Sequence, residues 1–249
     1  ETLRAPSRVR RVAVVAAVVA GLGLFLKTVA RNPSWMSTFV VMQTLNEEHP
    51  ESWRAFRARA LGLERVGEVE GAAEQWDVAV RLTPRNYTLL VQAGDFHGRL
   101  GDWEKGRGYL QRAIRVGPEL TNAYQLLSNH LLRRGQGREG HGVALEGLAR
   151  AEGDPQLWAL VSESYLLKGD LPAAVRARQA ALALDPKAPE QWRRLGEIWD
   201  AMGRPELASG ARERADTLND MDATGGTGKS GAVPMEAELP EDLGRSRSG

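Results

Sequence analysis

Apolar residues recur with the period of an amphipathic helix throughout residues 53–222, in runs of about fourteen residues. Glycines separate the runs in a series with a step of 34 residues: Gly67, Gly101, Gly135, Gly169 and Gly203. Glycine ends a helix readily, because the left-handed C-cap conformation costs little without a Cβ. The pattern predicts one pair of helices, here A and B, copied five times as 53–86, 87–120, 121–154, 155–188 and 189–222.

Small residues occupy two further columns of this 34-residue register. The eighth and twentieth positions of every repeat hold only Ala, Gly or Ser: Ala60, Gly94, Ser128, Ser162 and Gly196, then Ala72, Gly106, Gly140, Ala174 and Ala208. Two antiparallel helices approach closely only where their side chains are small, so these columns mark the A–B contact. Ser52, Asn86 and Asp154 stand where an N-cap of helix A belongs.

The order of bulky residue, small residue, turn glycine and closing proline over 34 residues resembles the tetratricopeptide repeat (TPR) family. This resemblance implies an all-α fold, a right-handed TPR superhelix of five helix-turn-helix repeats. The slot that holds Trp76 and Leu110 departs from the pattern later in the chain, where it holds Ala144, Arg178 and Arg212. The third repeat, with Gly140, Gly147 and Glu152, matches least well.

An uncharged segment near the N-terminus follows a basic flank, residues 1–11, with Arg8, Arg10 and Arg11. Residues 12–30 form about 19 residues or ~28 Å of helix if Lys27 reaches the membrane interface, which is close to the hydrocarbon thickness. We expect a single transmembrane helix. A cleaved signal peptide fits less well because of Lys27, and a buried soluble helix would need a polar face. The cation excess before the segment predicts a cytoplasmic N-terminus and periplasmic or otherwise extracytoplasmic repeats.

The segments on either side of the repeats have different expected roles. Residues 31–52 are predicted to be a linker with a capping helix, because Trp35, Phe39, Met42 and Leu45 have helical spacing. Residues 223–249 are rich in Gly, Ser, Pro and charge, and we expect a flexible tail.

Chemistry-bearing motifs are scarce in this sequence. The net charge of +1 does not favour nucleic-acid binding, and the absence of cysteine excludes disulfides and thiolate metal sites. Residues 223–230, A-T-G-G-T-G-K-S, approach a phosphate-binding loop but lack the strand before it and the helix after it. The four histidines lack metal-site spacing, and His97 stands at a packing position. We therefore expect no catalytic residue, cofactor, metal or nucleotide.

A partner-binding surface is the remaining candidate site. In a TPR array the A helices line the concave face, and their outward positions hold polar and charged residues here. The expected contact residues are Arg54, Arg57, Arg65, Arg99, Gln125, Asn129 and Arg133 in the first three repeats, then Glu163, Glu197 and Asp200. The face is thus predicted to be basic near the membrane and acidic far from it, which would orient a protein partner.

Two functions are consistent with these observations. The first is a non-catalytic, membrane-anchored scaffold that contacts the bilayer through residues 12–30 and stabilises a larger membrane complex as an accessory subunit, for example in respiration or photosynthesis. The alternative starts from residues 31–35 and 49–55, which resemble the junction between the last membrane span and the TPR tail of O-mannosyltransferase-like membrane glycosyltransferases. The chain would then be the C-terminal part of such an enzyme, and its start without methionine supports this slightly.

Overall fold

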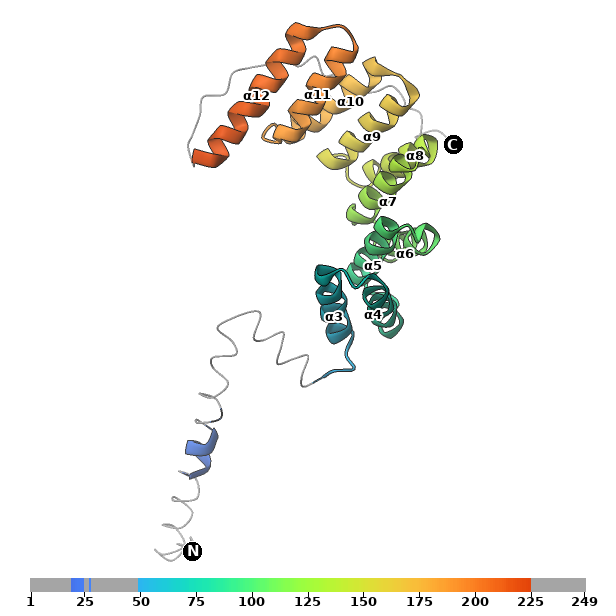
Figure 1. Ribbon diagram of the computed structural model, residues 1–249, viewed down its shortest axis with the longest axis vertical. Coiled ribbons are helices and arrows are strands. Elements are labelled where there is room, and N and C mark those ends of the chain that lie inside the picture. The colour runs from blue at the N-terminus through green and yellow to red at the C-terminus, as the bar shows by residue number, and fades with distance from the viewer. Residues whose placement is uncertain (1–18, 25–26, 28–48, 225–249) are drawn as a thin grey trace, which may run out of the picture. The chain divides into compact units, whose positions relative to one another are not determined.

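The computed structural model describes residues 19–24, 27 and 49–224 of the chain (Figure 1). Within 49–224 every regular element is a helix. The helices are α3 (Trp53–Val66), α4 (Val69–Leu82), α5 (Tyr87–Leu100), α6 (Trp103–Val116), α7 (Asn122–Arg133), α8 (Gly137–Leu148), α9 (Pro155–Lys168), α10 (Leu171–Leu184), α11 (Pro189–Ala201) and α12 (Pro205–Thr224). The all-helical fold predicted from the hydrophobic period is therefore confirmed for these residues.

The chain forms two compact units, residues 1–82 and 83–249. The described part of the first unit contains the pair α3 and α4, and the second contains the four pairs from α5 to α12. Within the second unit each pair packs against the next, so that α5, α7 and α9 lie on the inner side of its curve and α6, α8 and α10 on the outer side (Figure 1).

Each A–B turn contains one residue in the left-handed region. These residues are the five glycines of the 34-residue series, with φ of +79°, +90°, +74°, +76° and +71° from Gly67 to Gly203. No other described residue type has a positive φ. A side chain at any of these positions would strain the backbone, so the turn selects glycine there.

The contact between the two helices of a pair is closest where the sequence has its small columns. A Cβ added to Gly106 would lie 2.6 Å from the backbone nitrogen of Gly98 and 2.8 Å from the carbonyl oxygen of Gly94. In the next two pairs the backbones are close enough for a serine of helix A to reach helix B. Ser128 Oγ donates to the Gly140 carbonyl and Ser162 Oγ to the Ala174 carbonyl, each at 2.8 Å. The small columns thus bring the backbones together and give both buried hydroxyls a partner.

An aromatic residue at the fourth position ties the third, fourth and fifth repeats each to the repeat before it. Tyr124 Oη donates to the carbonyl of Pro118 at 3.2 Å, and the indole nitrogens of Trp158 and Trp192 donate to the residues six positions earlier, both at 2.9 Å. For Trp158 that residue is Glu152, which stands where Pro118 and Pro186 stand in the neighbouring repeats. The contact survives there because the acceptor is a backbone carbonyl, which any residue supplies.

The last described helix, α12, differs from the other B helices in length and in its outer surface. It has 20 residues, and Ala208, Ala211, Ala215 and Leu218 are buried against α11. Its opposite side is polar and exposed, with Ser209, Arg212, Glu213 and Asp216. A polar outer side suits the end of a stacked array, and no other described repeat covers this side of α12.

Several sequence predictions concern residues outside the described ranges. The expected span 12–30 is described only at 19–24 and 27, where the backbone is helical and the side chains are exposed. Among the described residues, no helix combines the length and the apolar character needed to cross a bilayer. The expected capping helix, the phosphate-loop-like motif and the tail lie almost entirely outside the described residues, and these predictions and the transmembrane span remain predictions.

Candidate partner-binding face

The residues predicted to bind a partner lie on five A helices. Arg54, Arg57 and Arg65 are on α3 of the first unit. In the second unit Arg99 is on α5, Glu163 on α9, and the remaining members are Gln125, Asn129 and Arg133 on α7 and Glu197 and Asp200 on α11. We call the solvent-facing side chains of α5, α7, α9 and α11 the A-helix face.

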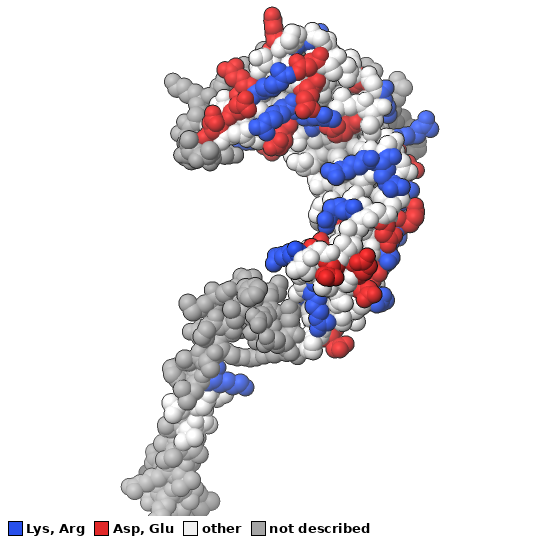
Figure 2. Space-filling model, in the orientation of Figure 1, with Lys and Arg blue, Asp and Glu red and all other residues white. Residues whose placement is uncertain are grey.

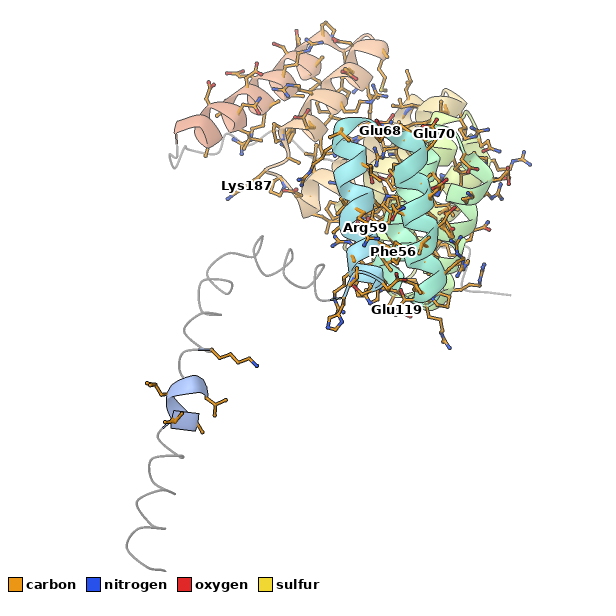
Figure 3. The ribbon with its side chains drawn as sticks, turned by 60° about the horizontal axis from the view of Figure 1, so that its bottom comes forward. Phe56, Arg59, Glu68, Glu70, Glu119 and Lys187 are labelled. Carbon is orange, nitrogen blue, oxygen red and sulfur yellow. The ribbon has the colours of Figure 1, made fainter. Side chains whose placement is uncertain are left out.

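Aromatic stacking governs the arginines of α3. Arg54 lies over the ring of Trp53, with its guanidinium carbon 4.5 Å from the ring centroid. Arg59 lies 5.0 Å from the ring centroid of Phe56 on the same helix and also donates to the carbonyl of Pro50 at 2.8 Å (Figure 3). Arg65, in the last turn, is exposed. Arg54, Arg59 and Arg65 are thus exposed, and Arg57 is partly exposed.

Two helices of the second unit share one carboxylate, Asp95 on α5. Its Oδ2 lies 3.0 Å from Nε of Arg99, and its Oδ1 lies 3.2 Å from Nε2 of His130 on α7. The hydrogen bond with His130, aided by Arg99, outweighs burial and holds the pKa of Asp95 below its usual value. The sequence analysis did not select Asp95 or His130, although both lie one turn or less from predicted face residues.

A row of polar side chains follows one side of α7. Its members, Asn122, Gln125, Asn129 and Arg133, are separated by three, four and four residues, which places them on the same side of a helix. Gln125 donates to Asp154 at 2.7 Å, and Asp154 in turn caps the N-terminus of α9. The side chains of the other three have no hydrogen-bond or ion-pair partner among the described residues, and Asn122 and Arg133 are exposed. We call these four residues the α7 row.

The neighbouring part of the face, on α9 and α11, is organised around Glu163. Both carboxylate oxygens accept hydrogen bonds from Arg194 of α11, at 2.8 and 2.6 Å, and Oε1 also accepts one from Arg178 of α10. Arg178 is only 3% exposed and further donates to Gln191 and to the carbonyl of Ala159. One carboxylate thus joins three helices of two repeats.

The protonation states of this network follow from its contacts. Burial acts against the charge of Glu163, but hydrogen bonds from Arg194 and the charge of Arg178 outweigh it and hold the pKa of Glu163 below its usual value. Burial lowers the pKa of Arg178, while the bonds to Glu163 and Glu197 raise that of Arg194. Because arginine stays protonated over all accessible pH, the network is fully charged at neutral pH.

Arginines also compensate the remaining acidic residues of this part of the face. Glu197 accepts a hydrogen bond from Arg194 at 2.5 Å, and Asp200 forms an ion pair with Arg212 of α12. Blue and red side chains accordingly alternate over α10–α12, whereas blue ones gather over α7 and α8 (Figure 2). The predicted acidic residues are present, but arginines balance their charges locally. Two of these arginines, Arg178 and Arg212, stand at the position that holds Trp76 and Leu110 in the first two repeats.

The described residues hold no group of three or more His, Asp or Glu side chains that could bind a metal ion. His97 is 2% exposed and contacts Phe96 and Tyr109, which confirms its packing role. His141 Nδ1 lies 2.7 Å from the hydroxyl of Ser164. These histidines are therefore structural partners of neighbouring side chains.

Comparisons with known proteins identify the fold. Neither a protein-family profile nor a curated protein sequence matches the chain. Among solved structures, a thermophilic TPR protein of Thermus thermophilus, TTC0263, is 19% identical with a TM-score of 0.57, covering 70% of this chain and 94% of its own. MamA from Desulfovibrio magneticus RS-1 is 20% identical with a TM-score of 0.56, covering 68% and 95%.

A third similar structure is the Cut9–Hcn1 hetero-tetramer of the APC/C, which is 18% identical with a TM-score of 0.62 and covers 75% of this chain and 37% of the matched chain. At these identities the similarity establishes the fold alone. The chain has the TPR fold that the 34-residue register resembles.

Proposed function

We propose that this protein is a non-catalytic, membrane-anchored scaffold that binds partner proteins through its A-helix face and stabilises a larger membrane complex. The observation that carries the proposal is the α7 row. Asn122, Asn129 and Arg133 offer donors and acceptors that no described side chain uses. On a surface where most charged side chains are paired within the fold, such groups are available to another polypeptide.

The fold supports a binding role over a catalytic one. The second unit presents a long row of A helices whose polar groups lie at the surface, and Asp95, His130, His141 and Glu163 are engaged with neighbouring side chains. Nucleophile, base and oxyanion donors would have to converge on one point for catalysis. The anchoring part of the proposal, residues 12–30 in a bilayer, rests on the uncharged run 12–26 within that segment. The charge bias supports periplasmic or extracytoplasmic repeats.

Reversal of three arginines tests the binding proposal. Arg65, Arg99 and Arg133 occupy the same position of the first three repeats, and all three side chains are exposed. The triple variant Arg65→Glu, Arg99→Glu and Arg133→Glu should keep its helical circular dichroism but retain much less partner protein on affinity purification from detergent-solubilised membranes. Exposed Arg115→Glu on α6 is the control. Arg65 lies on α3 of the first unit, whereas Arg99 and Arg133 belong to the A-helix face. Unchanged retention by the triple variant would exclude both α3 and the A-helix face as contact surfaces.

The second candidate is the C-terminal TPR portion of a polytopic membrane glycosyltransferase. It is favoured by the junction-like residues 31–35 and 49–55, and it would place the catalytic groups in residues beyond this sequence. The intact mass of the native product distinguishes the two candidates. A product near 27.2 kDa supports the accessory subunit, whereas a much larger one supports the glycosyltransferase.

A further inference from the structure

We infer that the α7 row, together with Arg99, is the docking surface for an acidic segment of the same chain, residues 232–243. The docking surface lies on the face that we propose for partner binding. The consequence of docking, that the segment competes with partner proteins, rests on that proposed function. The sequence of the segment is A-V-P-M-E-A-E-L-P-E-D-L, with four acidic residues and no basic one.

Charge complementarity is specific to this part of the face. Arg133 is exposed and has no ion-pair partner among the described residues. Two carboxylates flank the row, and both are engaged: Asp95 with Arg99 and His130, and Asp154 with Gln125 and the N-terminus of α9. On α9 and α11, by contrast, Glu163 and Glu197 are already bonded to arginines. An acidic segment therefore gains more at α7 than at any neighbouring A helix of the second unit.

The α7 row also suits the backbone of an extended peptide. From Asn122 to Arg133 it is about 17 Å long at 1.5 Å per residue, which corresponds to about five extended residues. Asparagine amides both donate and accept, so Asn122 and Asn129 can bond to peptide groups. Pro234 and Pro240 favour an extended conformation of the segment. Glu236 and Glu238 are two positions apart, so in an extended chain their side chains lie on the same side.

The connection from α12 is long enough for this docking. Helix α12 ends at Thr224, and neighbouring A helices α7 and α9 contact each other, as do α11 and α12. Helix α10 contacts both α9 and α11, so three helix-to-helix steps of about 10 Å lead from α12 to α7, or roughly 30 Å across the stack. The 20-residue α12 also carries Thr224 about 30 Å along the helix axes from the turn end where Arg133 lies, which makes the distance about 42 Å. Fourteen residues link Thr224 to Glu238. They span up to about 46 Å when extended. The carboxylates of the segment can therefore reach Arg133 within one chain.

Docking should be electrostatic and reversible, because the surface groups involved are exposed and the salt of the medium screens them. While residues 232–243 occupy the row, a partner must displace them. The segment thus competes with partner proteins for the row. Only a partner that binds the row more tightly, for example through more carboxylates, displaces it.

A photo-crosslinking experiment on the full chain tests this inference. The protein contains no cysteine, so Ala237→Cys provides a unique site for a benzophenone label. Detergent-solubilised protein is irradiated at low concentration, and the linked peptides are identified by mass spectrometry. We expect most intramolecular crosslinks to fall on α5 and α7, and their yield to drop at least five-fold when Arg99 and Arg133 are both changed to Glu.

Matched variants separate charge from any change of fold. Arg115→Glu on α6 should leave the crosslinks unchanged. In the Arg99→Glu and Arg133→Glu background, replacing Glu236, Glu238, Glu241 and Asp242 by Lys should restore them. Crosslinks that fall mainly on other helices, that link two copies, or that persist after charge reversal would overturn the inference.

The same preparations distinguish this inference from the proposed function. If proteins co-purify through the A-helix face while position 237 crosslinks elsewhere, only the docking inference fails. If position 237 crosslinks to α7 but the triple reversal leaves partner retention unchanged, only the proposed function fails.

Discussion

The third and fourth repeats show how one fold position serves two purposes. Asn129 on α7 and Glu163 on α9 stand 34 residues apart and occupy the same position of helix A. Asn129 has no side-chain partner among the described residues, whereas Glu163 accepts hydrogen bonds from two arginines. In helix B the paired slot holds Ala144 in the third repeat and the buried Arg178 in the fourth.

This difference separates the binding surface from the structural framework. A charged residue that is bonded within the fold connects neighbouring repeats and offers little to a partner protein. The partner protein would first have to displace the side chain that is already bonded to it. A polar residue without such bonds contributes little to folding and remains available. The role of a residue on the A-helix face therefore depends less on its own charge than on the helix B residue at the position of Ala144 or Arg178, which either leaves it unbonded or bonds it.

The largest effect is expected when Glu163 is removed. Glu163→Ala leaves Arg178 buried without its carboxylate, and we expect a loss of about 3 kcal/mol in the free energy of unfolding. The matched change Asn129→Ala should alter it by less than about 0.5 kcal/mol. Urea denaturation followed by circular dichroism measures both, and similar losses for the two variants would remove the distinction between the repeats.

A double variant converts the fourth repeat towards the others. Glu163→Asn combined with Arg178→Leu removes both charges. It also gives the fourth repeat a leucine at the position that Leu110 occupies in the second repeat. Replacing a buried ion pair by apolar packing is often neutral, so the double variant should recover about 2–3 kcal/mol relative to Glu163→Ala. A double variant as unstable as the single one would show that the network has a further role in the fold.

The B helices of the two repeats predict a smaller effect. Helix α8 contains four glycines in 12 residues, whereas α10 contains six alanines in 14. A Cβ at Gly142 meets nothing within 4 Å, so Gly142→Ala should raise the free energy of unfolding by about 1 kcal/mol.

Gly140 in the same helix provides the opposite control. A Cβ there would lie 2.8 Å from two side-chain carbons of Leu132 and 3.2 Å from the carbonyl oxygen of Ser128. Gly140→Ala should therefore destabilise the protein, by about 1–3 kcal/mol. Thermal melts of the two variants should move in opposite directions, and equal shifts would contradict the packing described for this pair.

Acid should weaken the fourth repeat in particular. The folded-state pKa of Glu163 lies below the unfolded-state value of 4.5. Its stabilising contribution is therefore complete above that value and declines as the pH falls through the lower, folded-state pKa. We expect wild type to lose more stability than Glu163→Gln between pH 5 and pH 2, as measured by urea midpoints. Parallel curves for the two proteins would show that Glu163 is not specially stabilised as a carboxylate.

Backbone requirements made much of this fold predictable from the sequence. Gly67 to Gly203 identify the turns because few other residues tolerate positive φ, and the small columns identify the A–B contact because backbones meet there. Both constraints act on residue type directly. The positions of the α7 row followed from the same register.

The partners of the charged residues could not be predicted in this way. Arg194 reaches Glu163 across 31 residues, and Arg178 reaches it across 15, through long side chains whose rotamers the register does not fix. The arginines in the slot of Trp76 were visible as departures, but the pattern did not reveal which carboxylates they bond. The expected acidic end of the face was therefore assessed from Glu163, Glu197 and Asp200 without the arginines that balance them.

One matched pair of crosslinking sites tests the central claim, that the face binds through α7 and not through α9. Asn122 and Gln156 occupy the same exposed position of neighbouring A helices, and the chain has no cysteine of its own. Asn122→Cys and Gln156→Cys, each carrying benzophenone, should be irradiated in native membranes. The account predicts several-fold more crosslinks from position 122, to partner proteins or to residues 232–243. Equal yields, or more from position 156, would contradict it.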